Sequence, residues 1–357
     1  MRKNLLLIIS SIQRGGTQKN IIDLFNYWKS SGHDIKIITY DQKIQNINKK
    51  IRKNVINLGL LKNSQNLFQS ILNNLKRIIA LRKIIKANPK VTILSFLCST
   101  NIITIFAGFG LKNKLFVCER NDMKHQDIGR IWHILRIFFY RFANKIITNN
   151  KRNFNILEKL AKKNKIYFIP NHILLKKFPK KKPEKIILSV GRLHSQKGFP
   201  ELIKAYALSK APSKNWKLVI IGEGPERKNL KKIVKNLKLK NKIFFKGFMD
   251  PYYWYQKSSI FILASRFEGT PNALLEAMSM KLPVIITNFP GGMYYVKNKK
   301  SGLIVPSLNV STLKKAIDEI INNKNLRNRL AAGALRNIKL LANHKKIFKE
   351  WDRLILS

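Results

Sequence analysis

Acidic residues are scarce in this sequence. Its 357 residues include 18 Asp and Glu against 70 Lys and Arg, so the formal net charge at pH 7 is +52. Such an excess is typical of proteins that bind nucleic acid or an anionic membrane. The excess is mostly Lys, in a chain that is also rich in Asn and Ile. An A/T-rich genome produces this joint bias without selection for binding, so both origins stay open.

Cysteines and long apolar runs are also rare. Only Cys98 and Cys118 are present, which excludes a disulfide framework and predicts a reducing, cytoplasmic location. No apolar run reaches about 18 residues, the length that a membrane-spanning helix requires. The apolar residues 5–9 follow a basic start but precede no cleavage site, so they predict a first buried strand and not a signal peptide.

Metal-binding and nucleic-acid-binding patterns are lacking too. The sequence has no Asp-x-Asp pair and no His/Cys cluster, so we expect no metal and no cofactor. It has no recognised nucleic-acid-binding motif, and its aromatic residues lie mostly in apolar runs, so we expect no nucleic-acid partner. A basic nucleic-acid-binding protein is nevertheless the alternative from another class, and it predicts steeply salt-dependent DNA or RNA binding.

Short apolar runs alternate with helical patterns along the whole chain, which predicts an α/β fold. The length favours two such α/β domains, each with a doubly wound, Rossmann-like sheet. We expect an N-terminal domain at 1–174, a linker at 175–183, a C-terminal domain at 184–342 and a final helix at 343–357 that packs back on the N-terminal domain. The predicted strands are 5–10, 35–39, 91–96, 114–118, 145–148, 166–169, 186–190, 217–221, 242–245, 260–263, 283–287 and 302–305.

Two glutamates eight residues apart, Glu268 and Glu276, flank a predicted helix start. Thr270 is expected to cap this helix, and Pro271 suits its first position. Backbone amides near the helix start, aided by the helix dipole, form a predicted anion site: those of Gly269, Thr270 and Asn272. Since carboxylates accept hydrogen bonds from sugar hydroxyls, the segment suits a ligand with phosphate in the middle and hydroxyls at both ends. A nucleotide-sugar is such a ligand.

Two cationic side chains also lie between a predicted strand and a predicted helix, earlier in the sequence. Arg192 follows the apolar strand 186–190, and Lys197 precedes a helix whose first turn contains Pro200. Ligands of α/β folds bind at this edge of a parallel sheet, so the two cations are candidates to hold a diphosphate. A similar strand-to-helix turn at Gly15–Gly16 lets backbone amides approach a ligand, although a plain turn explains it equally well.

These motifs resemble those of retaining glycosyltransferases of family 4, which have the two-domain GT-B architecture. The resemblance is strongest from about 184 to 306 and extends over the whole chain. It is carried by Ser189–Leu193 with Lys197–Gly198, Ile221–Pro225, Glu268–Glu276, and Gly291–Gly292 followed by Ser301–Pro306.

The resemblance implies a role for each matching residue. Arg192 and Lys197 would bind the donor diphosphate and stabilise it as a leaving group, without a metal. Glu268 would lie beside the transferred sugar, and Glu276 would bind the ribose hydroxyls.

Further positions follow from the same resemblance. Gly15–Gly16 would face the reaction centre from the first domain, and Gly247–Phe248 would hold the nucleobase through backbone atoms. Many relatives carry a histidine after the fifth strand, where this chain has Arg120 and Asn121, which are candidates for the acceptor or sugar contact.

The expected function is therefore retaining transfer of a hexosyl or N-acetylhexosaminyl group from a nucleotide-sugar, in particular a UDP-sugar, to a saccharide acceptor. The resemblance and the charge favour a lipid-linked acceptor in capsule, O-antigen, lipopolysaccharide or other envelope glycan synthesis. The enzyme would then be peripheral on the inner face of the cell membrane, bound to its anionic surface. A nucleotide-sugar epimerase of similar fold and a scaffold protein are the remaining alternatives.

The helix expected at 130–145 has an apolar arc wider than one core contact needs. A core helix is one interpretation. The other is an interfacial helix that docks on anionic lipid with Trp132 and Phe139 as anchors and with polar positions at Arg130 and Arg136, among others.

Overall fold

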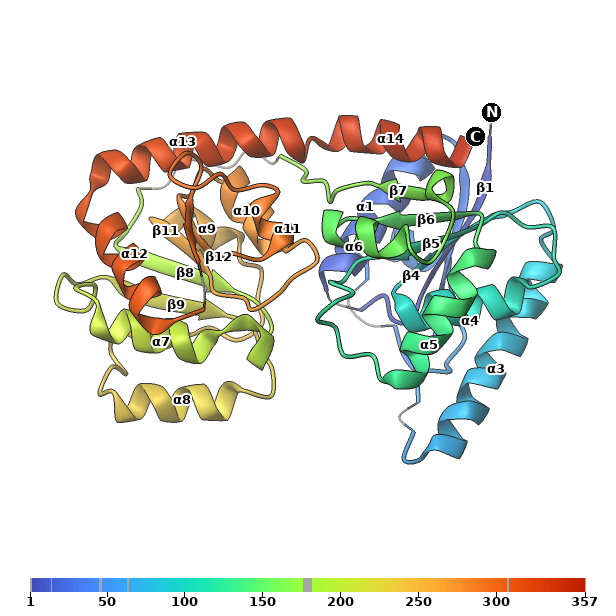
Figure 1. The fold of residues 1–357 in the computed structure, drawn as a ribbon, viewed down its shortest axis with the longest axis horizontal. Coiled ribbons are helices and arrows are strands. Elements are labelled where there is room, and N and C mark those ends of the chain that lie inside the picture. Colours follow the sequence, from blue (N-terminus) through green and yellow to red (C-terminus); the bar gives the residue numbers. More distant parts are fainter. Residues whose placement is uncertain are drawn as a thin grey trace. The chain divides into compact units, whose positions relative to one another are not determined.

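A computed structural model describes residues 2–13, 15–44, 47–62, 64–175, 182–306 and 308–356. The chain divides into two compact units, which consist of Met1–Asn171 with Lys345–Ser357 and of His172–His344. Figure 1 shows the order of their elements along the chain. Within the predicted linker 175–183, residues 176–181 lie outside the described residues.

The described residues of the N-terminal unit form a parallel sheet of seven strands in the order β3-β2-β1-β4-β5-β6-β7. The strands are β1 (Asn4–Ile9), β2 (Asp34–Thr39), β3 (Val55–Asn57), β4 (Thr92–Phe96), β5 (Leu115–Glu119), β6 (Lys145–Thr148) and β7 (Ile166–Phe168). The helices are α1 (Gly16–Ser30), α2 (Lys49–Arg52), α3 (Leu67–Lys86), α4 (Cys98–Gly108), α5 (Arg130–Phe139), α6 (Lys151–Leu157) and α14 (His344–Leu356), with 3-10 turns at Tyr140–Phe142 and Lys163–Lys165.

The central strands are buried on both faces, as helices on both sides of a parallel sheet require. Every residue of β4 and β5 is buried, which explains why unbroken apolar runs predict these strands well. The three-residue strand β3 is absent from the predictions because it lies at the sheet edge and is only partly buried.

The C-terminal unit has a six-stranded parallel sheet in its described residues, in the order β10-β9-β8-β11-β12-β13. Its strands are β8 (Ile186–Val190), β9 (Lys217–Ile221), β10 (Ile243–Phe245), β11 (Ile260–Leu263), β12 (Val284–Thr287) and β13 (Leu303–Val305). Its helices are α7 (Phe199–Leu208), α8 (Arg227–Asn236), α9 (Tyr252–Lys257), α10 (Asn272–Ser279), α11 (Pro290–Met293), α12 (Val310–Asn322) and α13 (Lys324–Leu341), with a 3-10 turn at Ser195–Lys197.

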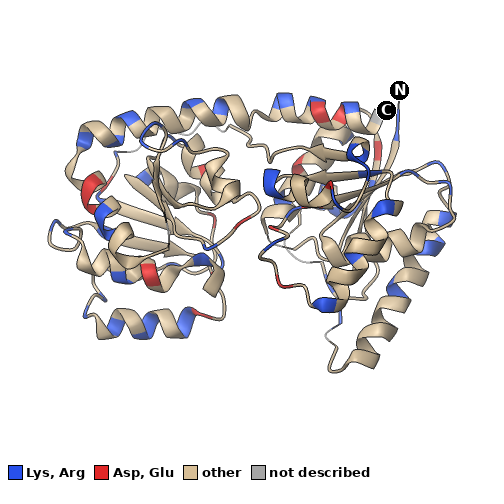
Figure 2. Cartoon of the chain, in the orientation of Figure 1, with Lys and Arg blue, Asp and Glu red and all other residues tan. Residues whose placement is uncertain are grey.

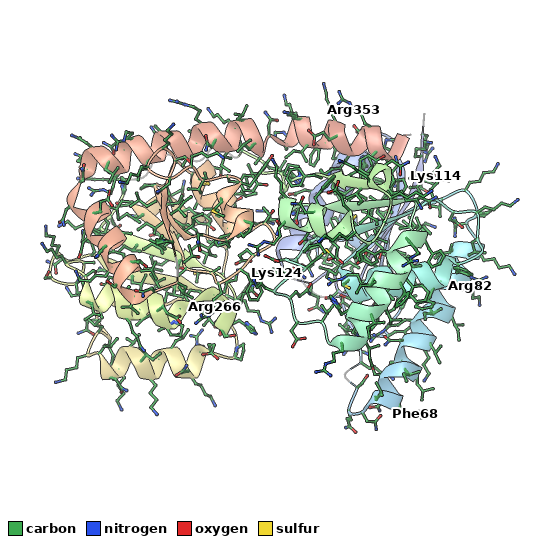
Figure 3. The ribbon with its side chains drawn as sticks, in the orientation of Figure 1. Phe68, Arg82, Lys114, Lys124, Arg266 and Arg353 are labelled. Carbon is green, nitrogen blue, oxygen red and sulfur yellow. The ribbon has the colours of Figure 1, made fainter. Side chains whose placement is uncertain are left out.

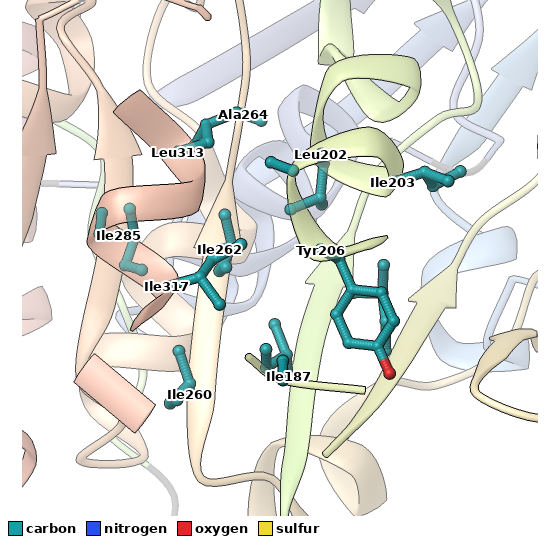
Figure 4. Close-up of a cluster of buried hydrophobic side chains, with 14 of the residues drawn as sticks. Ile187, Leu202, Ile203, Tyr206, Ile260, Ile262, Ala264, Ile285, Leu313 and Ile317 are labelled. Carbon is teal, nitrogen blue, oxygen red and sulfur yellow. The ribbon is translucent and has the colours of Figure 1, made fainter. Parts of the chain in front are cut away.

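Helices α7 and α12 cover one face of this second sheet. In Figure 4, Leu202 and Tyr206 of α7 and Ile317 of α12 surround Ile187 and Ile262 of the central strands. These side chains are almost fully inaccessible to solvent. The predicted α/β fold with two Rossmann-like domains is therefore confirmed, and each unit has its own apolar core.

The final helix, α14, packs on α1 of the N-terminal unit. Trp351 is buried against Trp28, with ring centroids 6.1 Å apart in an edge-on arrangement. Asp352 accepts hydrogen bonds from the indole nitrogen of Trp28, at 2.9 Å, and from the hydroxyl of Tyr27. Burial and then Asp352 raise the pKa of Tyr27 to about 12, so this hydroxyl stays a donor. An apolar contact and a charged hydrogen-bond acceptor thus fix the helix.

Both cysteines lie inside the N-terminal unit, and we predict that they are unreactive in the folded protein. Cys98 and Cys118 are buried, and burial raises the pKa of each thiol to about 12. Because the thiolate is the reactive form, a thiol-specific reagent at mildly alkaline pH should label neither residue until the protein is unfolded. Mass spectrometry of native and denaturant-treated samples measures this, and rapid stoichiometric labelling of the native protein would contradict the packing around β5.

Candidate active site at the carboxyl edge of the C-terminal sheet

The strand order of the C-terminal sheet reverses between β8 and β11. From β8 the chain proceeds outward through β9 and β10, and it then returns to the other side of β8 to add β11, β12 and β13. Strands β8 and β11 are neighbours and pair in parallel, through Ile260 and Phe261 of β11. The two loops that follow their carboxyl ends therefore start side by side and then lead away from each other. A strand-order reversal of this kind is where open α/β sheets bind ligands.

Lys197 and Glu268 meet at this reversal, one from each of the two loops. The Lys197 ammonium forms an ion pair with Oε1 of Glu268, and the Ser265 hydroxyl donates to the same oxygen at 2.8 Å. Their side chains are 17% and 11% exposed, so the pair is largely desolvated but within reach of a ligand. Lys197 comes from the loop after β8, and Glu268 comes from the loop after β11.

Backbone hydrogen bonds fasten these two loops to each other. The side-chain amide of Gln196 donates to the Phe267 carbonyl at 2.7 Å, and the Arg266 amide donates to the Gln196 carbonyl at 2.8 Å. Gly198, at φ +61°, ends the 3-10 turn so close to the Ala264 carbonyl that a Cβ would lie 2.1 Å from its oxygen. The position of Lys197 relative to Glu268 is thus set by the main chain.

Glu276 is positioned separately, on α10. The Tyr255 hydroxyl donates to Oε2 of Glu276 at 3.0 Å, and both residues are buried. Burial and then the Glu276 carboxylate raise the pKa of Tyr255 well above its usual range, so its hydroxyl remains a donor. Tyr255 therefore restricts the rotation of the carboxylate predicted to bind ribose.

The start of α10 differs from the prediction by one position. The helix begins at Asn272, and Pro271, at φ −79° and ψ 109°, is its N-cap, so the prediction that Thr270 caps the helix is wrong. The reason is that Pro271 has extended ψ, which leaves Thr270 outside the helix. The predicted amides of Gly269, Thr270 and Asn272 still lie in the loop that joins Glu268 to the helix.

Arg192 extends from the same edge. It follows β8 directly and is exposed, and no described residue pairs with its guanidinium. Its neighbour His194 caps the 3-10 turn by accepting a hydrogen bond from the Gln196 amide. Arg192 is thus the open cation of the loop, whereas Lys197 already has a carboxylate partner.

Gly247 and Phe248 follow β10 at the same edge of the sheet. Gly247 has φ +72°, and its carbonyl accepts a hydrogen bond from the amide of Gly222, at 2.8 Å, in the turn after β9. The Phe248 side chain is largely exposed. The loops after β8, β10 and β11, together with helix α10, thus contribute every C-terminal residue predicted for the site.

The N-terminal candidates lie at the carboxyl edge of their own sheet. Gly15 is the N-cap of α1, and Gly16 is its first residue. Arg120 is buried after β5, where its guanidinium lies 5.7 Å from the Phe96 ring centroid and 5.3 Å from that of Trp351. Its contact with Trp351 joins the end of β5 to α14, and it also donates a hydrogen bond to Asn171 at 3.3 Å.

Asn121 is likewise engaged within the N-terminal unit. Its backbone carbonyl accepts a hydrogen bond from the side chain of Asn153 at 2.6 Å. The sugar or acceptor contact expected of Arg120 and Asn121 stays a prediction, and the structure gives Arg120 an additional packing role.

A separate open cavity of about 1300 Å³ lies at the opposite edge of the C-terminal sheet. Its lining includes Lys185, Trp216, Ser259 and Pro283, which directly precede β8, β9, β11 and β12. It is therefore at the amino ends of the strands, away from Lys197 and Glu268.

The described residues hold no group of three or more His, Cys, Asp or Glu side chains arranged to bind a metal ion. Nor does any described helix combine the length and apolar character needed to cross a membrane. The charged side chains predicted for the candidate site are Arg192, Lys197, Glu268 and Glu276.

Sequence patterns do not single out Ser265 or Tyr255. Ser265 lies three residues before Glu268, a weak signal, and Tyr255 stands in an aromatic stretch of α9 that suggests only packing. Their contacts with the two glutamates depend on tertiary structure.

Two Rossmann-like units with this site define the GT-B class of transferase folds. The fold matches sucrose-phosphate synthase from Thermosynechococcus elongatus with a TM-score of 0.85 at 18% identity, covering 99% of this chain and 98% of that chain. It also matches HepE from Anabaena in complex with UDP and glucose, with a TM-score of 0.80 at 16% identity, over 99% of both chains.

Sequence comparison identifies the family. Residues 171–336 match the family described as glycosyl transferases group 1. The chain is 31% identical over 253 residues to the N-acetylgalactosamine-N,N'-diacetylbacillosaminyl-diphospho-undecaprenol 4-alpha-N-acetylgalactosaminyltransferase of Campylobacter jejuni, covering 65% of this chain and 67% of that protein. The chain belongs to the group 1 glycosyltransferases.

A second Campylobacter jejuni relative matches almost end to end. The GalNAc-alpha-(1->4)-GalNAc-alpha-(1->3)-diNAcBac-PP-undecaprenol alpha-1,4-N-acetyl-D-galactosaminyltransferase is 28% identical over 359 residues, 98% of this chain and 97% of that protein. The family resemblance therefore spans both units.

The close approach of α11 to the glutamate loop generates a prediction. A Cβ at Gly291 would lie 1.6 Å from the Gly269 carbonyl oxygen, so Gly291→Ala should displace the Glu268 loop or lower stability by about 1–3 kcal/mol. Thermal unfolding measures the loss. Gly108→Ala is the matched control, because a Cβ there meets only Leu115, at 3.9 Å. Equal melting temperatures for the two variants would contradict the packing of α11 on this loop.

Proposed function

We propose that this protein is a retaining, family 4 enzyme that transfers a hexosyl or N-acetylhexosaminyl group from a UDP-sugar to a lipid-linked saccharide at an anionic membrane surface. The observation that carries the proposal is the Lys197–Glu268 pair at the strand-order reversal, with Glu276 held by Tyr255 on the helix that follows. The acceptor proposal is supported by the two Campylobacter relatives, whose names specify diphospho-undecaprenol-linked glycans.

The chemistry follows from the charges. Departure of a nucleoside diphosphate leaves negative charge on its terminal phosphate, and a fixed cation in a partly desolvated site stabilises that charge strongly. Arg192 and Lys197 supply two such cations, and we propose that they do so without a protein-bound metal. In the absence of donor, Glu268 compensates Lys197, so the lysine is held in place before the diphosphate arrives.

Relatives named for capsule and lipopolysaccharide synthesis support an envelope glycan as the product. They include the capsular polysaccharide biosynthesis glycosyltransferase CapM of Staphylococcus aureus, 26% identical over 59% of this chain and 58% of that protein. The inner face of the cell membrane, where lipid-linked intermediates are built, is the proposed place of action.

The proposal predicts selective, EDTA-resistant binding of one donor in a panel of UDP-, GDP- and ADP-sugars. Lys197→Ala and Arg192→Ala should each weaken binding of the corresponding nucleoside diphosphate by about tenfold or more, since each removes a cation from the diphosphate. Lys235→Ala, on the exposed end of α8, is the control and should bind normally. Calorimetry measures the affinities.

Glu268→Gln separates binding from turnover within the same experiment. Because the amide no longer competes for the Lys197 ammonium, nucleoside diphosphate affinity should stay equal or rise while sugar transfer or donor hydrolysis falls. Failure of every donor to bind would refute the proposal, and formation of an epimerised sugar without acceptor would favour the epimerase alternative.

Tyr255→Phe tests the position of Glu276. Loss of one hydroxyl hydrogen bond to a carboxylate should weaken nucleoside diphosphate binding by about tenfold, roughly 1.5 kcal/mol. Tyr206→Phe is the matched control, because its buried hydroxyl donates to the Trp216 carbonyl beside the amino end of β9. The control should lose stability but keep its affinity. Unchanged affinity in Tyr255→Phe would show that Glu276 needs no positioning.

A further inference from the structure

Helix α3 exposes an apolar stripe to solvent. Phe68, Ile71, Leu75 and Ile79 follow one another at spacings of three and four residues, so they share one side of the helix. Phe68 is 71% exposed and Ile79 68%, whereas only Leu81 and Ile85 of this 20-residue helix are buried. Figure 3 labels Phe68 near the start of α3 and Arg82 further along it. A helix in a soluble core would show the reverse distribution.

Helix α5 carries a second exposed stripe, Ile131, Ile134 and Phe138, each more than half exposed. The proposed anchors Trp132 and Phe139 are partly buried and pack against the N-terminal core, so they are less accessible than this stripe. Arg136, expected on a polar face, is buried as well, beside the carboxylate of Glu119. Helix α5 therefore packs one face against the core and exposes another to solvent.

A groove joins the two stripes. It has a volume of about 580 Å³, its floor includes Ile102 and Phe106 of α4, and Ile71, Leu75 and Ile131 line it from the two sides. The groove therefore connects the two stripes through Ile71, Leu75 and Ile131. We name the exposed apolar residues of both stripes the docking face and define it as Phe68, Ile71, Leu75, Ile79, Ile131, Ile134 and Phe138.

The two helices of the docking face carry charge of one sign. Neither α3 nor α5 contains an acidic residue, while Lys76, Lys83 and Lys86 of α3 and Arg130 of α5 are exposed. Figure 2 shows both helices with blue segments and without red. An apolar surface with basic flanks matches the boundary between anionic headgroups and acyl chains.

We propose that the docking face binds an anionic bilayer, with the apolar side chains of α3 and α5 inserted at the acyl boundary and their lysines against the headgroups. The inference rests on the proposed function in placing the enzyme at a membrane, and it identifies the surface that makes the contact. Nucleic acid would leave the exposed Ile and Phe side chains unburied. A second copy of this chain would bring two basic faces together without acidic partners.

Vesicle flotation of the full-length protein tests the proposal, with phosphatidylcholine vesicles that either contain or lack phosphatidylglycerol, at ~100 mM salt to limit non-specific attraction. The double variant Phe68→Ser/Ile79→Ser should bind the anionic vesicles about tenfold more weakly, because two side chains lose their apolar environment. The matched control is Leu208→Ser/Leu340→Ser, which removes two leucines that are 64% and 66% exposed in the C-terminal unit. It should bind like the unchanged protein.

A charge-reversal pair separates the docking face from the general positive charge. Lys76→Glu/Lys83→Glu should weaken binding markedly more than Lys231→Glu/Lys235→Glu, which alters the equally basic helix α8. This pair also keeps the test decisive if the serine variant does not fold. Thermal unfolding and nucleoside diphosphate binding of every variant report whether the C-terminal site is intact.

Equal loss of vesicle binding in the face and control variants would overturn the proposal, as would no loss in either. A shift from dimer to monomer in size-exclusion chromatography with unchanged vesicle binding would assign the face to a second copy and likewise overturn it. Because donor binding is measured on the same proteins, failure of the docking face and failure of the proposed glycosyl transfer give different results.

Discussion

The parallel order of the C-terminal strands is the constraint on which the candidate site depends. Since all strands run in one direction, every loop that follows a strand emerges at one edge, and the reversal beside β8 separates two of these loops. Lys197 and Glu268, 71 residues apart in sequence, meet there as an ion pair. The pair is thus a consequence of topology, while the hydrogen bonds of Gln196 and Ser265 determine its geometry.

Carboxylates are scarce in this chain, and four of the buried ones among the described residues lie near strand ends. Asp41 follows β2, Glu119 ends β5, Asp122 follows it closely, and Glu268 follows β11. Each either accepts a hydrogen bond from a neighbouring loop or helix or forms an ion pair with it. Burying a carboxylate is costly unless it is partnered, so these positions are more constrained than the abundant surface lysines. Because acidic residues are few, the position of a glutamate in this sequence is a more specific indicator of a functional site than the position of a lysine.

Sequence patterns predicted the strands of both sheets well, for a physical reason. Strands buried on both faces are continuous apolar runs. Arg192, Lys197 and Glu268 each stand beside a glycine, which marks the loop after a strand in the sequence. The sequence patterns failed where two local conformations of the chain have similar energies. Pro271 suits either the first helical position or the cap, and only the path of the loop from Glu268 selects the cap.

Sequence patterns also do not show which face of a helix packs against the core, and α3 illustrates the reason. Its sequence contains one set of aliphatic residues that includes Leu81 and Ile85 and another that includes Ile71 and Ile79, so periodicity alone does not tell which set faces the core. The same ambiguity in α5 led to the choice of Trp132 and Phe139, which pack against the core and are partly buried. Contact with α4 decides both cases, and this contact depends on the order of β1, β4 and β5 in the sheet.

Net charge alone does not distinguish a membrane-binding protein from the product of a biased genome, but the distribution of apolar residues does. Helix α8 is strongly basic, yet its apolar residues Leu230 and Val234 are buried, so it presents only charge. Helices α3 and α5 combine basic residues with exposed Ile, Leu and Phe side chains. Exposure of these side chains to water is unfavourable. A biased genome composition does not explain why they lie on the same face of a helix. A general bias towards Lys would enrich all three helices equally. The coincidence of charge with an unburied apolar groove in the N-terminal unit is therefore the stronger argument for a bilayer, whereas the +52 charge by itself supports only attraction to any polyanion.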